Sequence, residues 1–247
     1  MSYNILLCGV GGQGTVLASK LLAATAGGAG LCVHSAETIG MAQRGGPVTS
    51  HVRIGEDAYS PLIPKGGADL IIAFEPAEAV RNLDYLKKDG AVIVNENCIR
   101  PVTESLNPTG YDGTEMLEYL KRKIGRLITV NADSLCESLG SSKFFNVAVL
   151  GVAQGARLLD FSEEEILSTI ENTVKEDFVK INKKAFLLGR EIGMKEAGIG
   201  MFAKGKEDAF DLSEENKPAG VSRHLTKEEA EKLLSVRIEV RKKNHKA

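Results

Sequence analysis

Short apolar runs recur along the first 130 residues and alternate with stretches of helical character. The runs 4–8 and 70–74 are typical of buried strands, and further strands are predicted over 31–34, 48–54, 91–95 and 127–130. The stretches between them predict helices over 15–24, 76–86 and 114–124, with Gly90 ending the second of these. Because strands and helices alternate, the pattern predicts a three-layer α/β/α, Rossmann-like domain with a mostly parallel sheet.

Two local patterns refine the predicted sheet. The first strand, a glycine loop, a helix and the run 31–34 form a β–α–β unit, which predicts a parallel pair with a right-handed crossover. Residues 48–54 alternate in polarity, and Gly55, Glu56 and Asp57 follow them as a turn. This second segment predicts an antiparallel hairpin.

The residues after Phe144 predict helices. Residues 146–159 are small and apolar, which suits close helix packing. Ser162 and Glu165 fit a capping box, followed by apolar residues on one helix face. A last helix of the domain is predicted over 177–192.

The composition changes beyond Met194. Charged residues, glycines and prolines indicate a linker, and a second capping box at Thr226 opens a further helix. We therefore expect one domain over 1–193, followed by a charged linker and helical C-terminal extension over 194–247.

Composition and charge exclude several classes of protein. The 247 residues are 43% hydrophobic and 26% charged, which is typical of a folded domain rather than a disordered chain. The formal net charge of −2 gives no electrostatic case for binding nucleic acid. No run of about 20 apolar residues predicts a membrane span. The first residues lack a basic region, so a signal peptide is not expected and the predicted location is cytoplasmic.

Four cysteines, Cys8, Cys32, Cys98 and Cys136, are far apart in the sequence and form no C-x-x-C motif. Zinc and iron–sulfur sites usually use clustered thiolates. Each cysteine lies in or beside an apolar segment, so we expect buried, reduced thiols rather than metal ligands.

A glycine-rich loop, Gly9-Val10-Gly11-Gly12-Gln13-Gly14, joins the first predicted strand to the first helix. In this pattern the first glycine permits a tight turn, the second lets a ligand approach the backbone, and the last lets the helix lie close to the strand. Amide groups at the start of the helix favour a phosphate or pyrophosphate. The loop therefore predicts a phosphate-bearing ligand, although a tight turn without a ligand remains open.

The loop by itself does not identify its ligand. NAD binding requires an acidic residue at the end of the second strand, where His34 and Ser35 stand and Glu37 comes late. The adenylating enzymes that use a similar loop often add paired C-x-x-C motifs, which are missing here. No Walker A lysine, thiamine diphosphate signature, nucleophile elbow or H-E-x-x-H motif occurs. The sequence thus carries no recognisable catalytic apparatus of its own, and a stand-alone NAD(P)- or ATP-binding enzyme stays as an alternative.

A second motif, Gly40-Met41-Ala42-Gln43-Arg44-Gly45-Gly46, suggests a loop that presses its backbone against another group. The planar guanidinium of Arg44 suits a phosphate or a carboxylate, while capping carbonyl groups or pairing with an acid is the alternative.

Five segments in register resemble one family. They are the two glycine motifs, Ser50-His51-Val52-Arg53, Ser60-Pro61-Leu62-Ile63-Pro64 and Ala73-Phe74-Glu75-Pro76, and the helix around Asn182 resembles the closing helix of that family. Residues 3–192 are in this way similar to the gamma subunit or domain of 2-oxoacid:ferredoxin oxidoreductases, of the indolepyruvate oxidoreductase beta-subunit type.

The resemblance implies a function. Such enzymes oxidatively decarboxylate a 2-oxoacid, here an indolepyruvate or arylpyruvate, with coenzyme A and ferredoxin to give an acyl-CoA and carbon dioxide. Thiamine diphosphate, Mg and 4Fe-4S clusters would lie on an alpha partner subunit, which would also meet ferredoxin. This chain would act in a hetero-oligomer, be inactive alone, and help to form the coenzyme A site.

The residues that we expect to contact coenzyme A are Gly11, Gly12, Gln13, Gly14 and Thr15, and Gln43 and Arg44 are expected to line the subunit interface near the ligand. Glu75 is interpreted as a helix N-cap with a ligand role as the alternative, and Asn95 carries the same ambiguity. His51 is interpreted as a packing residue, and Arg53 as a solvated or interface strand residue.

Overall fold

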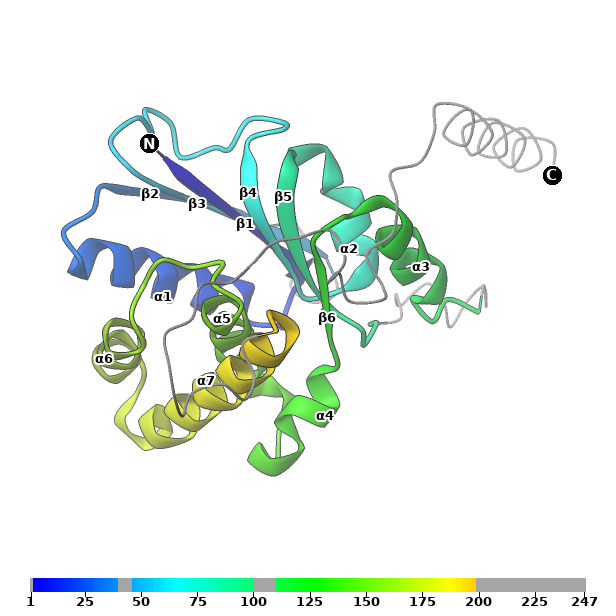
Figure 1. The fold of residues 1–247 in the computed structure, drawn as a ribbon. Coiled ribbons are helices and arrows are strands. Elements are labelled where there is room, and N and C mark those ends of the chain that lie inside the picture. Colours follow the sequence, from blue (N-terminus) through cyan, green and yellow to red (C-terminus); the bar gives the residue numbers. More distant parts are fainter. Residues whose placement is uncertain (1, 40–45, 100–109, 199–247) are drawn as a thin grey trace, which may run out of the picture.

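A six-stranded sheet forms the centre of the computed structural model, which describes residues 2–39, 46–99 and 110–198 (Figure 1). The strands are β1 (Tyr3–Val10), β2 (Val33–Ile39), β3 (Pro47–Ile54), β4 (Ala68–Ala73), β5 (Leu86–Asn95) and β6 (Leu127–Val130). Their order in the sheet is β2-β3-β1-β4-β5-β6. β1, β4, β5 and β6 are parallel, whereas β3 runs antiparallel to both of its neighbours.

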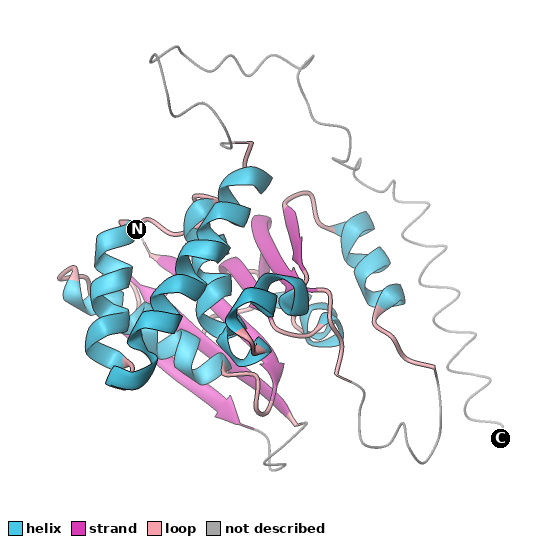
Figure 2. Ribbon diagram, turned by 90° about the horizontal axis from the view of Figure 1, so that it is seen from below, coloured by secondary structure: helices cyan, strands magenta, loops and turns pink. Residues whose placement is uncertain are grey.

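Helices cover both faces of this sheet (Figures 1 and 2). They are α1 (Thr15–Gly28), α2 (Pro76–Arg81), α3 (Thr114–Lys123), α4 (Ala132–Cys136), α5 (Phe145–Gly155), α6 (Glu163–Thr173) and α7 (Glu176–Glu196). α2 and α3 pack on one face, and the other helices pack on the opposite face. The predicted three-layer α/β fold with a mostly parallel sheet is confirmed.

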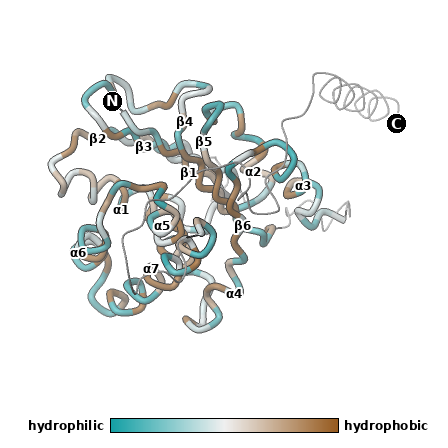
Figure 3. Tube along the Cα trace, viewed as in Figure 1, coloured by the Kyte–Doolittle hydropathy of each residue, from teal (hydrophilic) through white to brown (hydrophobic). Residues whose placement is uncertain are grey.

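Alternate side chains of the central strands enter two separate cores. Ile5 and Leu7 of β1 face α1 and α5, while Leu6 and Cys8 face α2 and α3. The strands are therefore apolar without a break, as strands buried on both faces are. Figure 3 shows this as a continuous apolar band through β1, β4 and β5.

Glycines allow α5 and α7 to cross in close contact. A β-carbon on Gly189 would overlap the carbonyl oxygen of Ala148, and one on Gly193 would overlap that of Val152. Gly151 and Gly155 of α5 approach the backbone of α7 in the same way. The small apolar segment from 146 onward is thus confirmed as a close-packing helix.

The connection from β1 to β2 differs from the prediction. β1 and β2 run in the same direction but do not pair, because β3 inserts between them and bonds both. β3 forms an antiparallel pair with β2, the strand that precedes it in the chain. The predicted hairpin turn at Gly55 is therefore wrong, since β4 pairs with β1 and not with β3.

Gly90 also has a different role from the predicted one. The helix predicted over 76–86 ends at Arg81, a short 3-10 turn follows, and β5 begins at Leu86 with Gly90 inside it. The β4–β5 register shifts between Ala68 and Leu70, and a β-carbon on Gly90 would lie 3.0 Å from the carbonyl oxygen of Ala68. Gly90 is needed for this irregular stretch of strand, and not for ending a helix.

The end of the described chain agrees with the sequence. Ser162 and Glu165 form the predicted capping box at the start of α6, and α7 extends the predicted last helix to Glu196. The predicted linker and extension from 199 onward lie outside the described residues. No helix of the described residues is long and apolar enough to cross a membrane.

Candidate functional site

A cleft of about 800 Å³ opens at the carboxyl edge of the parallel strands. From β1 the chain continues into α1 on one face of the sheet, and from β4 it continues into α2 on the other. The neighbouring strands β1 and β4 therefore form a topological switch point, where open α/β sheets bind ligands. Residues from five connections line the cleft: Gly11, Gly12, Gln13, Phe74, Asn95, Glu96, Asn97, Cys98, Ile99, Asp112, Ala132, Asp133, Ser142, Lys143 and Phe145.

The glycine loop contributes backbone to this cleft. Gly12 has φ +100°, and a β-carbon there would meet nothing within 4 Å, so the loop is open on its outer side. The amides of Gly12, Gly14, Thr15 and Val16 donate to no acceptor among the described residues. The amide of Gly11, in contrast, donates to the Gly46 carbonyl oxygen over 2.9 Å. Gly11 thus bonds to Gly46 instead of offering its amide to a ligand.

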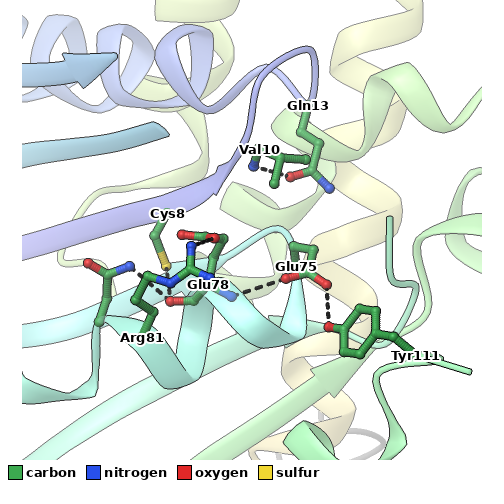
Figure 4. Close-up of polar contacts among 8 residues, drawn as sticks. Cys8, Val10, Gln13, Glu75, Glu78, Arg81 and Tyr111 are labelled. Atoms are coloured by element: carbon green, nitrogen blue, oxygen red, sulfur yellow. Dashed lines mark hydrogen bonds and ion pairs between the residues drawn. The ribbon is translucent and has the colours of Figure 1, made fainter. Parts of the chain in front are cut away.

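Gln13 holds the loop together from inside (Figure 4). Its side-chain oxygen accepts from the Val10 amide at 2.8 Å, and its side-chain nitrogen donates to the Phe74 carbonyl oxygen at 2.8 Å. A β-carbon on Gly9 would lie 2.6 Å from that side-chain oxygen and 2.8 Å from Phe74. Gly9 is therefore required so that Gln13 can bridge the ends of β1 and β4, and the tight turn is made by the glycines that follow.

The last glycine of the loop lies against α5 and not against a strand. Gly14 has φ +82°, and a β-carbon there would lie 3.0 Å from Cβ of Asn146. Thr15 is buried beside it, and its hydroxyl has no hydrogen-bond partner among the described residues. Of the predicted ligand residues, Gly11, Gly12 and Gln13 line the cleft, whereas Gly14 and Thr15 do not.

The N-termini of α1 and α5 meet here, and both lack compensating charge. Neither helix has an acidic residue in its first turn. α1 has no side-chain cap, whereas α5 follows a 3-10 turn (Ser142–Phe144) that the Ser141 side chain caps. The other helices that begin along the cleft have a side-chain cap or an acidic residue at their start: Glu75 caps α2, Asn131 caps α4, and Glu115 stands in the first turn of α3. Helix N-termini carry partial positive charge, so the positive potential that remains is concentrated between α1 and α5. Among the described residues that line the cleft, Lys143 is the basic one, and it lies just before α5.

Carboxylates and asparagines line the opposite side of the cleft. The carboxylate-bearing residues are Glu96, Asp112 and Asp133. Asn95 is buried and fully used, since its oxygen accepts from the Ala132 amide at 3.1 Å and its nitrogen donates to the Phe74 carbonyl oxygen at 3.1 Å. Asn95 thus ties β4, β5 and α4 together. The cleft is polarised, with cationic character at Lys143 and anionic character beyond β5.

A buried acidic cluster lies behind the cleft at the start of α2 (Figure 4). Glu75 accepts from the Glu78 amide at 3.0 Å and from the Tyr111 hydroxyl at 2.6 Å, which confirms its interpretation as an N-cap. Burial and the Glu75 hydrogen bond raise the pKa of Tyr111, so the phenol remains a proton donor. Burial likewise raises the pKa of Cys8, whose thiol donates to the Glu78 carbonyl oxygen.

Glu78 is the least compensated member of this cluster. One carboxylate oxygen pairs with Arg81, and the other is buried without a partner among the described residues. Burial raises the pKa of Glu78, nearby Arg81 opposes the rise, and Glu75 adds to it. Through Glu75 the cluster holds Tyr111, which is next to Asp112 in the wall of the cleft. None of the carboxylates of the cluster lines the cleft itself.

Two further interpreted residues act in structure. His51 is buried, and its Nδ1 accepts from the Ile63 amide at 3.2 Å, as expected of a packing histidine. Arg53 donates to Asn4 at 3.1 Å and to the Ser60 carbonyl oxygen at 2.7 Å, so it fixes the loop after β3.

The cysteines agree only partly with their prediction. Cys8 and Cys136 are buried, but Cys98 is half-buried at the cleft and Cys32 is exposed. No group of three or more His, Cys, Asp or Glu residues in the described part of the chain could hold a metal ion.

Gln43 and Arg44 lie outside the described residues, so their predicted interface role stays a prediction. The sequence reasoning missed Lys143 and Asn146. The sequence carried no signal for them, since only the contact between Gly14 and Asn146 brings this segment to the glycine loop.

Comparisons with known proteins agree with the fold described above. Residues 4–192 match the family described as pyruvate ferredoxin/flavodoxin oxidoreductase. The indolepyruvate oxidoreductase subunit IorB of Archaeoglobus fulgidus is 43% identical over 190 residues, which covers 76% of this chain and 94% of the relative. The pyruvate/ketoisovalerate oxidoreductases common subunit gamma of Thermococcus kodakarensis is 30% identical over 183 residues, covering 72% and 92%.

Solved structures share the fold. The gamma subunit of a keto/oxoacid ferredoxin oxidoreductase from Geobacter sulfurreducens aligns with a TM-score of 0.58 at 23% identity, covering 79% of this chain and 98% of that one. The 2-oxoglutarate:ferredoxin oxidoreductase of Magnetococcus marinus, solved with 2-oxoglutarate, coenzyme A and succinyl-CoA bound, also gives 0.58 at 19% identity, covering 78% of this chain and 31% of that one. The chain therefore belongs to the pyruvate ferredoxin/flavodoxin oxidoreductase family, as a subunit of the 2-oxoacid oxidoreductase type.

Proposed function

We propose that this chain is the coenzyme A-binding subunit of an indolepyruvate or arylpyruvate oxidoreductase and is inactive alone. In the overall reaction the 2-oxoacid loses its carboxylate as carbon dioxide, and the remaining acyl group forms a thioester with the thiol of coenzyme A. The electrons released pass one at a time to ferredoxin. The identity of the relatives supports the indolepyruvate type.

One observation carries the proposal. The N-termini of α1 and α5, which both lack acidic residues in their first turns, lie together at a cleft at the switch point of the sheet, next to Lys143. Unbonded amides and a positive helix end are suited to a pyrophosphate, which coenzyme A contains. The cleft volume of about 800 Å³ is also in the range of small-molecule sites.

The residues of this chain would bind and orient the ligand. The amide of Gly12 would donate to the pyrophosphate, and Lys143 would balance its charge. Gln13 would act through the loop, because both ends of its side chain are already hydrogen-bonded to Val10 and Phe74. The neutral pantetheine arm suits the side near Asn97 and Asp133, where phosphates would be repelled.

The reactive centre would belong to a partner subunit. Thiamine diphosphate with Mg supplies the chemistry that cleaves the bond to the carboxylate, and 4Fe-4S clusters accept the electrons. We place all of these on an alpha subunit, which would also meet ferredoxin, and the predicted contacts of Gln43 and Arg44 would form towards it. The domain division at 193 and the cytoplasmic location stay predictions.

The alternative of a stand-alone NAD(P)- or ATP-binding enzyme is less favoured. In a dinucleotide site the acidic residue that holds the ribose ends the strand next to β1. Here β3 occupies that position, and β2 with Glu37 lies at the far edge of the sheet. Glu37 instead accepts from the Ser19 hydroxyl at 3.3 Å.

The test compares two aspartate variants in the complex assembled with its partner subunit. Gly12→Asp places a carboxylate at the open loop and is expected to weaken coenzyme A binding by about tenfold or more through charge repulsion. Gly28→Asp is the control, because Gly28 also has open space around it but lies at the far end of α1. Calorimetry with coenzyme A, NADH, NADPH and ATP gives the affinities. Equal coenzyme A affinities for both variants, or turnover by the isolated chain, would refute the proposal.

A further inference from the structure

A second, smaller hollow adjoins the cleft. This side pocket has a volume of about 310 Å³ and lies between the start of α1, the start of α5 and the first turns of α7. Leu17, Phe144 and Phe178 supply its apolar surface, and Asn146 and Lys175 supply polar groups. Lys143 lines both the side pocket and the cleft, so the two hollows meet at this lysine.

The charges of the two hollows differ. Lys143 and Lys175 line the side pocket, and no Asp or Glu is among the described residues that do so. The far side of the cleft carries Glu96, Asp112 and Asp133. A ligand with several phosphates would therefore extend from the glycine loop towards the side pocket and away from these acids.

The aromatic surface of the side pocket is accessible. Phe178 is 49% exposed although it belongs to a long helix, and it is among the most exposed large apolar residues of the described chain. Its amide donates to the Lys175 carbonyl oxygen at 2.8 Å, so the ring and the lysine are held within one turn. An aromatic ring beside a cation is suited to a nucleobase whose sugar bears a phosphate.

We propose that the side pocket binds the adenine base and the 3′-phosphate of coenzyme A. Phe178 stacks on the base, Lys175 pairs with the 3′-phosphate, and Lys143 lies between the 3′-phosphate and the pyrophosphate at the glycine loop. This inference rests on the proposed function, because it assigns the remaining part of the same ligand.

The proposal predicts a preference between two ligands that differ in one group. Dephospho-coenzyme A has the same base, pyrophosphate and pantetheine arm but lacks the 3′-phosphate. Lys175 should therefore contribute to binding of coenzyme A and not of dephospho-coenzyme A. Because Lys175 is exposed, we expect the contribution to be about fivefold in affinity.

The experiment measures both affinities by calorimetry in the assembled complex. Lys175→Ala should weaken coenzyme A about fivefold and leave dephospho-coenzyme A unchanged. Lys180→Ala is the matched control, since Lys180 is an exposed lysine on the same helix that lines a different hollow. Phe178→Leu keeps an apolar side chain in α7 but removes the ring, and it should weaken both ligands about fivefold or more.

The outcomes separate this inference from the proposed function. If Lys175→Ala and Phe178→Leu leave both affinities unchanged while Gly12→Asp weakens them, the side pocket does not hold the nucleotide and this inference is wrong. If Gly12→Asp has no effect either, the proposed function fails, and this inference fails with it. Loss of both ligands to the same extent in Lys175→Ala would also overturn the assignment of the 3′-phosphate.

Discussion

Gly14 and Asn146 join the starts of two helices that lie 132 positions apart in the sequence: a β-carbon on Gly14 would lie 3.0 Å from Cβ of Asn146. The contact places two helix N-termini that lack acidic residues in their first turns at one end of the cleft. The positive potential that we assign to a pyrophosphate therefore depends on a tertiary contact, and not on the glycine loop alone.

Gly14→Ala should be much more destabilising than Gly12→Ala. Both positions have positive φ, which costs an alanine about 1 kcal/mol, but only Gly14 faces a neighbouring side chain within 4 Å. We expect about 3 kcal/mol for Gly14→Ala, since overlap with Asn146 adds to the backbone cost. Urea unfolding of the two variants checks this, and equal losses would show that α1 and α5 do not touch at this glycine.

Gln13→Ala should loosen the glycine loop. The substitution leaves the Val10 amide without its acceptor, whereas the Phe74 carbonyl oxygen keeps Asn95 as a donor. The expected loss is about 1–2 kcal/mol in the free energy of unfolding. Gln13→Glu retains an acceptor for Val10 and should lose less. A Gln13→Ala protein as stable as the parent would mean that Gln13 does not hold the loop.

Gly189→Ala should disrupt the crossing of α5 and α7. The added methyl group would overlap the Ala148 backbone, and we expect a loss of about 3 kcal/mol. Gly28→Ala is the opposite case, because Gly28 is helical and has open space around it, so it should gain about 0.5 kcal/mol. Thermal unfolding distinguishes them, and a tolerated Gly189→Ala would contradict the close helix contact.

Glu78 should make stability decrease as pH rises. Burial raises the pKa of Glu78 above its ordinary value of 4.5, so the folded protein holds this proton more tightly than the unfolded chain. The resulting stabilisation is complete below the ordinary pKa and is lost as pH rises through the raised one. The difference in unfolding free energy between Glu78→Gln and the parent should therefore shift in favour of the variant as pH rises above the ordinary pKa of 4.5.

Glu165→Gln is the control of opposite sign. Hydrogen bonds from Ser162 lower the pKa of Glu165, so its stabilisation is present above the ordinary value and is lost as pH falls. The difference in unfolding free energy between Glu165→Gln and the parent should change with pH. If the corresponding difference for Glu78→Gln does not, burial does not raise the pKa of Glu78 and this prediction is wrong.

The sequence predicted what depends on local pattern. The strand around Ile5, the helix after Gly14 and the capping box at Ser162 were found because burial periodicity and cap chemistry are encoded in neighbouring residues. The position of β3 between β1 and β2 was missed, since the sequence pattern does not show which strands pair. Gly90 was misplaced because a glycine that allows a strand irregularity looks the same as one that ends a helix.

The same limit applied to the site. The glycine loop was identified from its motif, but the roles within it changed: Gln13 bonds Val10 and Phe74, and Thr15 does not line the cleft. Lys143 could not be assigned, because only the packing of α5 against Gly14 brings it to the loop.

The most direct test of the central claim is a crystal structure of the assembled complex with coenzyme A. We expect a pyrophosphate oxygen about 2.7–3.2 Å from the amide nitrogen of Gly12, with Lys143 alongside. Coenzyme A bound away from this turn, with that amide turned to water or to protein side chains, would contradict the claim.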